Sequence, residues 1–143
     1  MSVPRVAVVI AGLGRVPEEL LRASETVLGP LEDVLALGFE QVPAPEVARR
    51  LAEATEGADR GAGVLIIADL CGSTVANQSY ALARERARYD VLCGANLAML
   101  MKLYTVDRRV LDPTALAQAL AETARRGISI ASDQIPGETS RDA

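Results

Sequence analysis

The chain starts with a strand, a glycine loop and a helix, a pattern that restricts it to few folds. An apolar run at Val6–Ile10 breaks at Ala11-Gly12-Leu13-Gly14, and Pro17-Glu18-Glu19 follows. Proline and acidic residues are typical of the first turn of a helix. A helix that starts directly after a strand points free N–H groups at the loop between them, and ligands of open α/β sheets bind at such strand ends. The loop 11–14 is therefore a candidate binding site.

The same alternation continues along the sequence. We expect further strands at 33–39, 63–69, 89–94 and 128–131, and helices at 18–28, 46–56, 75–88, 96–104 and 113–126. This order predicts an α/β fold: a mostly parallel, doubly wound sheet of about four strands with helices on both faces, plus a C-terminal edge strand. We expect one domain over residues 1–131 and a disordered polar tail over 132–143.

Composition excludes several classes of function. The 143 residues carry a net charge of −4, and the arginine clusters fall on predicted helices among acidic residues, so we expect no nucleic-acid partner. No apolar run is long enough to span a bilayer, and the N-terminus lacks the pattern of a signal peptide. We therefore expect a cytoplasmic protein that does not insert into membranes.

A second candidate loop follows the apolar strand predicted at 63–69, which ends on Asp69. Gly72, Ser73 and Thr74 come next, directly before a helix. In a doubly wound sheet this loop and the loop 11–14 emerge at the same edge. Asp69 could hold a cation or an imidazole or take a proton, and Ser73 or Thr74 could help to bind a phosphate. One of the two hydroxyls is expected simply to cap the helix.

Several catalytic motifs are absent. The sequence contains no histidine, so a Ser-His or Cys-His pair cannot form. The first loop has Pro17 where a dinucleotide fingerprint needs its third glycine, and it lacks the Gly-Lys-Ser/Thr end of a P-loop. Cys71 and Cys93 have no metal-type spacing, and we expect small buried side chains rather than a disulfide. We expect neither a cofactor nor a metal.

Three segments in order resemble the IIA component of the mannose-family bacterial phosphotransferase system (PTS). They are VAVVIAGLGRVPEELL, GVLIIADLCGSTVANQS and VLCGANLAMLMKL, and the resemblance covers roughly residues 5–130. In that family a histidine in the first loop takes phosphate from the carrier protein HPr and passes it to a IIB component. The resemblance also implies a dimer that exchanges a C-terminal strand, here Ile128–Ala131.

The resemblance places the phosphate-accepting histidine at Leu13. It matches Asp69 to the aspartate that orients the imidazole and Thr74 to the phosphate-binding serine, and it retains Gly72 and Asn96. The implied site therefore consists of Gly12, Leu13, Gly14, Asp69, Gly72, Ser73 and Thr74.

A leucine cannot carry phosphate, so the resemblance favours a non-enzymatic regulatory or binding protein, with an HPr-like or IIB-like protein or a second copy of itself as partner. Two alternatives stay open. Asp69, Ser73 or Thr74 could have become the phosphate acceptor, or the site could bind a small anion.

Overall fold

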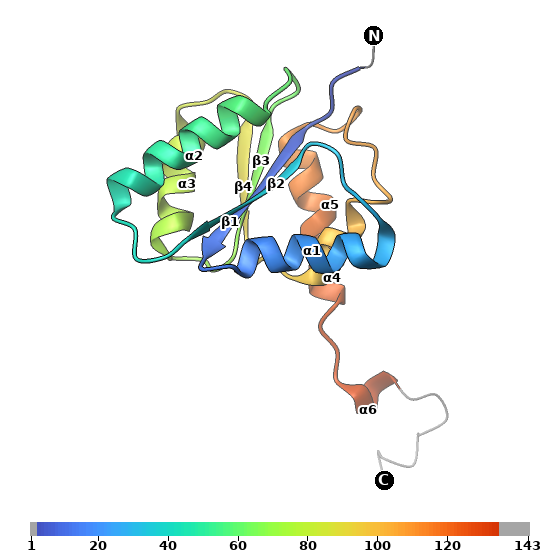
Figure 1. Ribbon diagram of the computed structural model, residues 1–143. Helices are drawn as coiled ribbons and strands as arrows, with labels where there is room; N and C mark the ends of the chain where they lie inside the picture. Colours follow the sequence, from blue (N-terminus) through green and yellow to red (C-terminus); the bar gives the residue numbers. More distant parts are fainter. Residues whose placement is uncertain (1–2, 135–143) are drawn as a thin grey trace.

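The computed structural model describes residues 3–134 and has the predicted α/β architecture (Figure 1). The sheet contains β1 (Ala7–Leu13), β2 (Val34–Phe39), β3 (Val64–Ala68) and β4 (Tyr89–Cys93). The helices are α1 (Val16–Leu28), α2 (Ala44–Ala58), α3 (Thr74–Arg84), α4 (Leu97–Lys102), α5 (Pro113–Arg126) and α6 (Ala131–Gln134). All strand pairs are parallel, and the strand order is β2-β1-β3-β4. The prediction of a four-stranded parallel sheet is confirmed.

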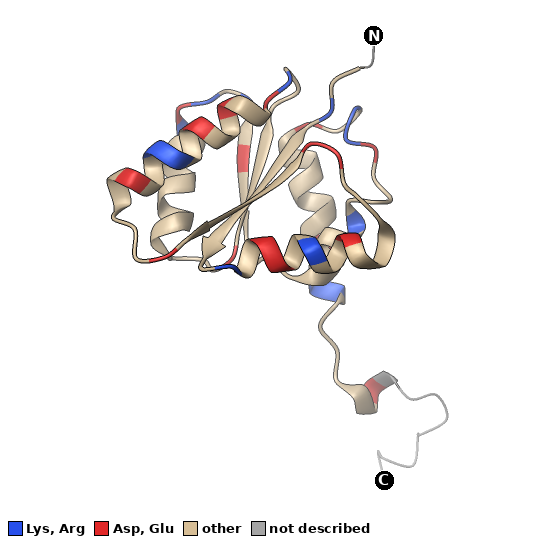
Figure 2. Cartoon of the chain, viewed as in Figure 1, with Lys and Arg blue, Asp and Glu red and all other residues tan. Residues whose placement is uncertain are grey.

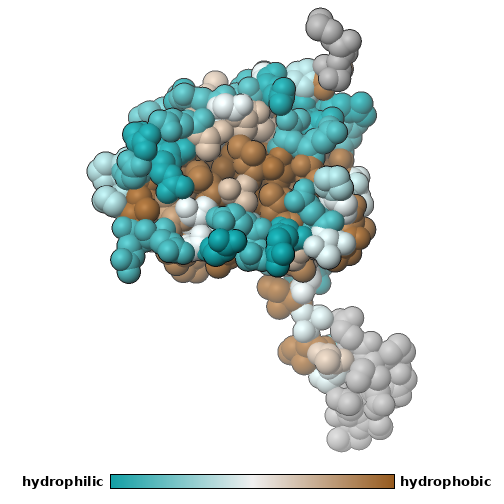
Figure 3. Space-filling view, in the orientation of Figure 1, coloured by the Kyte–Doolittle hydropathy of each residue, from teal (hydrophilic) through white to brown (hydrophobic). Residues whose placement is uncertain are grey.

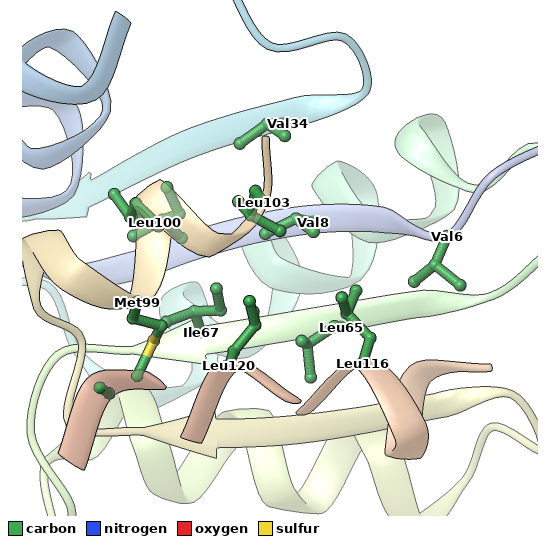
Figure 4. Packing of buried hydrophobic residues seen from close by; sticks show 12 residues of the cluster. Val6, Val8, Val34, Leu65, Ile67, Met99, Leu100, Leu103, Leu116 and Leu120 are labelled. Carbon is green, nitrogen blue, oxygen red and sulfur yellow. The ribbon is translucent and has the colours of Figure 1, made fainter. Parts of the chain in front are cut away.

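The two faces of the sheet pack against different helices. On one face, Val6, Val8 and Ile10 lie in a core with residues of α4 and α5, as Figure 4 shows. On the other face, alternate β1 residues pack with residues of α2 and α3. Because successive side chains of a strand point to opposite faces, one apolar run contributes residues to both cores. Each fully buried Val, Leu or Ile side chain contributes about 1.5–3 kcal/mol.

The first strand is longer than the sequence predicts. It runs to Leu13 instead of breaking at Ala11, because the ladder with β2 continues through the pairs Gly12↔Gly38 and Leu13↔Phe39. Pairing with β3 stops earlier, at Ala11. Three of the four residues predicted to form the loop 11–14 are therefore strand residues.

The predicted C-terminal strand does not form within the single chain. Residues 128–130 form no strand, and Ala131–Gln134 is a short helix, so the predicted tail begins with ordered structure at residues 132–134. A strand needs a neighbouring backbone, and the segment after α5 leaves the body of the molecule (Figure 1). The rest of the predicted disordered tail, 135–143, lies outside the described residues.

Many of the charged residues lie on the outer helices (Figure 2), although Arg86 and Arg88 lie beyond the end of α3 instead of on it. Arg49 pairs with Glu46 and Glu53 along α2, and Arg126 pairs with Glu122 on α5. These pairs are exposed and contribute little to stability. Figure 3 shows the contrast with the sheet: an apolar strip crosses the face where β2 lies, between the hydrophilic surfaces of α1 and α2.

No helix within residues 3–134 is both long enough and apolar enough to cross a membrane.

One buried residue that stabilises the fold could not be predicted from the sequence. Arg108, in the segment between α4 and α5, is only 6% exposed. Its guanidinium donates to the carbonyl of Val6 at 2.9 Å and to that of Glu32 at 2.6 Å, and the Val6 N–H donates to the Arg108 carbonyl. Burial lowers the pKa of Arg108 from its ordinary value. This side chain joins three segments at the amino end of the sheet.

We expect Arg108→Met to lower the free energy of unfolding by about 2–3 kcal/mol, because the carbonyls that Arg108 satisfies lose a buried charged donor. Urea unfolding followed by circular dichroism measures the change. Arg109→Met is the matched control, because Arg109 is exposed and pairs only with Asp107. An equal loss in both variants would contradict the structural role of Arg108.

Candidate functional site

The structure brings the two candidate loops together at the carboxyl edge of the sheet. The Leu13 N–H donates to Asp69 Oδ2 at 2.8 Å. Asp69 is the first residue after β3, and its own N–H donates to the Ala11 carbonyl at 3.1 Å. In a parallel ladder the next N–H of β1 on this side needs another acceptor, and β3 has ended. The Asp69 carboxylate supplies it.

Two glycines make this close approach possible. A Cβ atom on Gly12 would overlap the Asp69 carboxylate, and one on Gly38 would overlap the Gly14 carbonyl and the Glu18 side chain. Gly12 and Gly38 are register partners at the ends of β1 and β2. Gly12 could be identified from the sequence, but Gly38 could not, because its only signal is a glycine inside an apolar strand.

The two oxygens of Asp69 differ. Oδ2 accepts from Leu13, whereas Oδ1 is buried and accepts no hydrogen bond from the described residues. A buried carboxylate oxygen without a donor is costly. It marks the position at this edge where an added hydrogen-bond donor would be most stabilised.

Leu13 places an apolar side chain at the end of β1, beside Phe39 and the residues that follow it. The side chain is 55% exposed, and it lines an open depression of about 490 Å³ together with Gly14, Phe39, Glu40 and Gln41. The Arg50 guanidinium lies 4.5 Å from the Phe39 ring centroid. The side of the site facing β2 is thus partly aromatic and aliphatic.

The amide donors of the first loop are already used. The Leu13 N–H bonds to Asp69, and the Gly14 N–H donates to the Phe39 carbonyl at 2.9 Å. Glu18 and Glu19 already complement the dipole of α1 in its first turn. The loop 11–14 is therefore poorly suited to hold an anion with its backbone, contrary to the first interpretation of its glycines.

The second loop retains more capacity for a ligand. Ser73 is the N-cap of α3 and accepts from the Ala76 N–H at 3.1 Å, as predicted for one of the two hydroxyls. Thr74 is exposed at the first position of α3, and Gly72 has a φ of +85°. Within residues 3–134 no hydrogen bond joins Ser73 or Thr74 to the loop 11–14. The first turn of α3 contains no acidic residue.

The prediction for the cysteines is wrong. Cys71 and Cys93 form a disulfide, with their Cα atoms 5.3 Å apart. Cys71 lies in the second candidate loop, and Cys93 ends β4. They are 22 residues apart in sequence, and only the parallel pairing of β3 with β4 brings them together. Spacing alone could not reveal this.

Asn96 has a clear structural role. It is the N-cap of α4, where its side chain accepts from the Met99 N–H at 2.8 Å. Its amide nitrogen also donates to the Ala124 carbonyl at 3.3 Å. The retained asparagine of the third matching segment thus fixes α4 and α5.

A protein-family model described as PTS system fructose IIA component (EIIA-man) matches residues 7–123. The PTS system mannose-specific EIIAB component of Escherichia coli (strain K12) is 32% identical over 129 residues, which cover 86% of this chain. The protein of the same name from Shigella flexneri matches equally well. The chain spans 38% of the length of these curated relatives.

Two of the solved structures with the same fold are PTS components. The phosphotransferase system component EIIA from Streptococcus agalactiae has a TM-score of 0.78 at 26% identity, covering 90% of this chain and 98% of that chain. The mannose/sorbose specific IIA subunit from Enterococcus faecalis has a TM-score of 0.78 at 22% identity, covering 89% and 95%. The second likeness supports the fold alone.

We expect Gly12→Ala to lower the free energy of unfolding by about 1–3 kcal/mol, because the added methyl group must displace the Asp69 carboxylate from the Leu13 N–H. Thermal unfolding and the amide chemical shift of Leu13 measure the two effects. Gly57→Ala is the control: this glycine lies in α2 with open space around its Cα, so the substitution should stabilise by about 0.5–1 kcal/mol. A Leu13 amide that keeps its shift in Gly12→Ala would contradict this account.

Proposed function

The chain belongs to the EIIA-man family of PTS IIA components, and on that premise we propose that it is a binding or regulatory member that does not itself carry phosphate. The observation that carries the proposal is Leu13 at the end of β1, where the resemblance places the phosphate-accepting histidine. The sequence contains no histidine at any position. A phosphohistidine relay through these 143 residues has no acceptor atom.

The rest of the implied site supports binding without transfer. Asp69, which the resemblance implies would orient the imidazole, instead holds the backbone of Leu13. The leucine side chain contributes only hydrocarbon to the surface at the end of β1. The scaffold of a phosphate carrier is thus present, while the group that performs nucleophilic attack on a phosphoryl group is replaced.

The surface around the site fits a protein partner. Four large apolar side chains are exposed at the carboxyl edge of the sheet: Leu13 (55%), Val16 (48%), Leu70 (59%) and Leu97 (38%). Leu13 ends β1 and Leu70 follows β3, while the other two begin α1 and α4. All four therefore lie around the carboxyl ends of the strands. Exposed apolar clusters of this kind mark interaction sites. We infer an HPr-like or IIB-like protein as the partner, in a sugar-uptake pathway.

The alternative acceptors differ in availability. Ser73 caps α3, and Asp69 is engaged by Leu13 under Gly12. Thr74 is exposed at the start of α3, and its hydroxyl makes no hydrogen bond within residues 3–134. It is the one hydroxyl of the site that a phosphoryl donor, or a small anion at this helix end, could reach.

We expect no phosphate adduct when the protein is incubated with phosphoenolpyruvate, the general phosphotransferase enzyme and HPr, because position 13 offers no nucleophile. We expect Leu13→His to gain one acid-labile phosphate, since it restores a nucleophile at the position where the resemblance places the acceptor, next to Asp69. Intact-protein mass spectrometry before and after mild acid measures both results.

Two control variants separate the possible outcomes. Leu13→His combined with Asp69→Ala should be phosphorylated more slowly, and Thr74→Ala should leave the unmodified state of the parent unchanged. A stoichiometric adduct on the parent chain would contradict the proposal, and its loss in Thr74→Ala would assign the acceptor to Thr74.

We also propose that the protein forms a homodimer through its C-terminal arm, residues 128–130. The arm leaves the body after α5 and carries Ile128 and Ile130, which are 78% and 69% exposed (Figures 1 and 3). A groove of about 400 Å³ runs between β4 and α5, lined in part by Leu92, Ala117 and Ala121. Because β4 is an edge strand, its free backbone can pair with the arm of a second copy.

We expect the parent protein to have a dimeric mass in solution and Ile128→Asp/Ile130→Asp to be monomeric, because charges on the arm oppose burial in the groove. Light scattering after size-exclusion chromatography measures the mass. Val110→Asp, at a 78% exposed apolar residue away from the arm, should leave the dimer intact. A monomeric parent at micromolar concentration would contradict strand exchange.

A further inference from the structure

We propose that Cys71 and Cys93 are a reversible thiol–disulfide pair that controls the mobility of the 69–74 loop, the loop that carries Asp69, Ser73 and Thr74. The disulfide joins this loop to the end of β4, the neighbouring strand. The inference does not depend on the loss of phosphate transfer. It concerns the oxidation state of the loop itself.

The disulfide is the main restraint on the middle of the loop. Residues 70–72 are all exposed. Their backbone hydrogen bonding within residues 3–134 stays inside the loop, where the Leu70 carbonyl accepts from the Ser73 N–H at 3.2 Å. Gly72 lies in the left-handed region, with nothing close to its Cα. Without the bond to Cys93, this segment would be held only at its two ends.

The two ends of the loop are fixed independently of the disulfide. Asp69 is hydrogen-bonded to β1 through both its N–H and its carboxylate, and Ser73 caps α3. Reduction is therefore expected to release residues 70–72 while the sheet stays folded. The loop would change its dynamics and its presentation of Leu70 without global unfolding.

The two sulfurs are differently placed for thiol–disulfide exchange. Cys71 is exposed, whereas Cys93 is partly buried. The Tyr80 hydroxyl, on α3, donates to Cys93 Sγ at 3.1 Å. A hydrogen bond to sulfur stabilises the thiolate, and the sulfur that best bears negative charge is the better leaving group. The geometry therefore favours attack on Cys71 Sγ with Cys93 as the leaving thiolate.

The proposed reaction is a two-electron reduction by a protein dithiol. A thiolate of the dithiol attacks Cys71 Sγ, a mixed disulfide forms, the Cys71–Cys93 bond breaks, and its electron pair stays on Cys93 Sγ. The second thiol of the reductant loses its proton and attacks the reductant's first sulfur, which is bonded to Cys71 in the mixed disulfide. Cys71 leaves as a thiolate, and the reductant becomes a disulfide. Protonation of the two cysteine thiolates completes the reaction.

The test compares the oxidised and reduced full chain. The protein is reduced with a thioredoxin-type dithiol, and the free thiols are counted by alkylation and mass spectrometry while circular dichroism follows the fold. We expect two alkylated thiols in a folded protein. Hydrogen–deuterium exchange at the Ser73 amide, which donates to the Leu70 carbonyl across the loop, should become at least about tenfold faster, with unchanged exchange at the β1 amides 8–10. Resistance to reduction until the protein unfolds, or equal loop exchange in both states, would overturn the proposal.

Variants test the parts of the mechanism. Cys71→Ser and Cys93→Ser should both reproduce the fast loop exchange of the reduced parent. If a variant fails to fold, hydrogen–deuterium exchange of the reduced parent still measures the effect of losing the disulfide. Tyr80→Phe keeps the ring but removes the hydroxyl, so reduction should slow several-fold at an unchanged unfolding midpoint. An unchanged rate of reduction in Tyr80→Phe would overturn the direction of attack and the role of Tyr80.

Discussion

The backbone of β1 pairs with β2 on one side and with β3 on the other, so both of its faces must be covered by helices. Its alternating residues enter two separate cores, one against α4 and α5 and one against α2 and α3. The difference in length between its two ladders creates the candidate site. Where β3 ends and β2 continues, the side of β1 facing β3 is left with an N–H that needs an acceptor, and Asp69 provides it.

The candidate site is thus a consequence of sheet geometry as much as of chemistry. Leu13 is held through its backbone, and Gly12 leaves the space in which the carboxylate sits. Nothing in this arrangement depends on the side chain at position 13. A change at this position can therefore alter the chemistry of the edge while the loop, the carboxylate and the strand ends keep their places.

The sequence was sufficient for the fold because the apolar runs are long and their alternation with helices is regular. Val64–Ala68 and the helix Pro113–Arg126 lie where they were predicted. The end of β1 was harder to predict, because a glycine reads as a loop signal even where a partner strand continues the ladder through it. The strand expected after α5 does not form within the single chain for a related reason: its residues alternate as predicted, but a strand also needs a second backbone to pair with.

In the site, Asp69 and Ser73 could be assigned from their positions at the ends of predicted elements. Long-range partners could not. The disulfide depends on which strands are neighbours, since Ala68 pairs with Cys93 only in this strand order. Arg108 acts on backbone carbonyls, which leave no signature in side-chain identity. Gly38 matters because of a close approach between β2 and the segment after β1 that only the folded chain defines.

The exposure of the leucine at the end of β1 has a consequence for how such a chain changes over generations. Leucine and histidine codons can differ by a single base, and a side chain that stands mostly in solvent imposes little folding penalty on either choice. If this position is the former phosphate acceptor, as we propose, a change between a phosphate-carrying and a non-carrying protein would hardly alter the stability of the fold. Mutation could change leucine to histidine or histidine to leucine at little cost in stability. Only the requirements of the partner protein would then decide which of the two residues is retained.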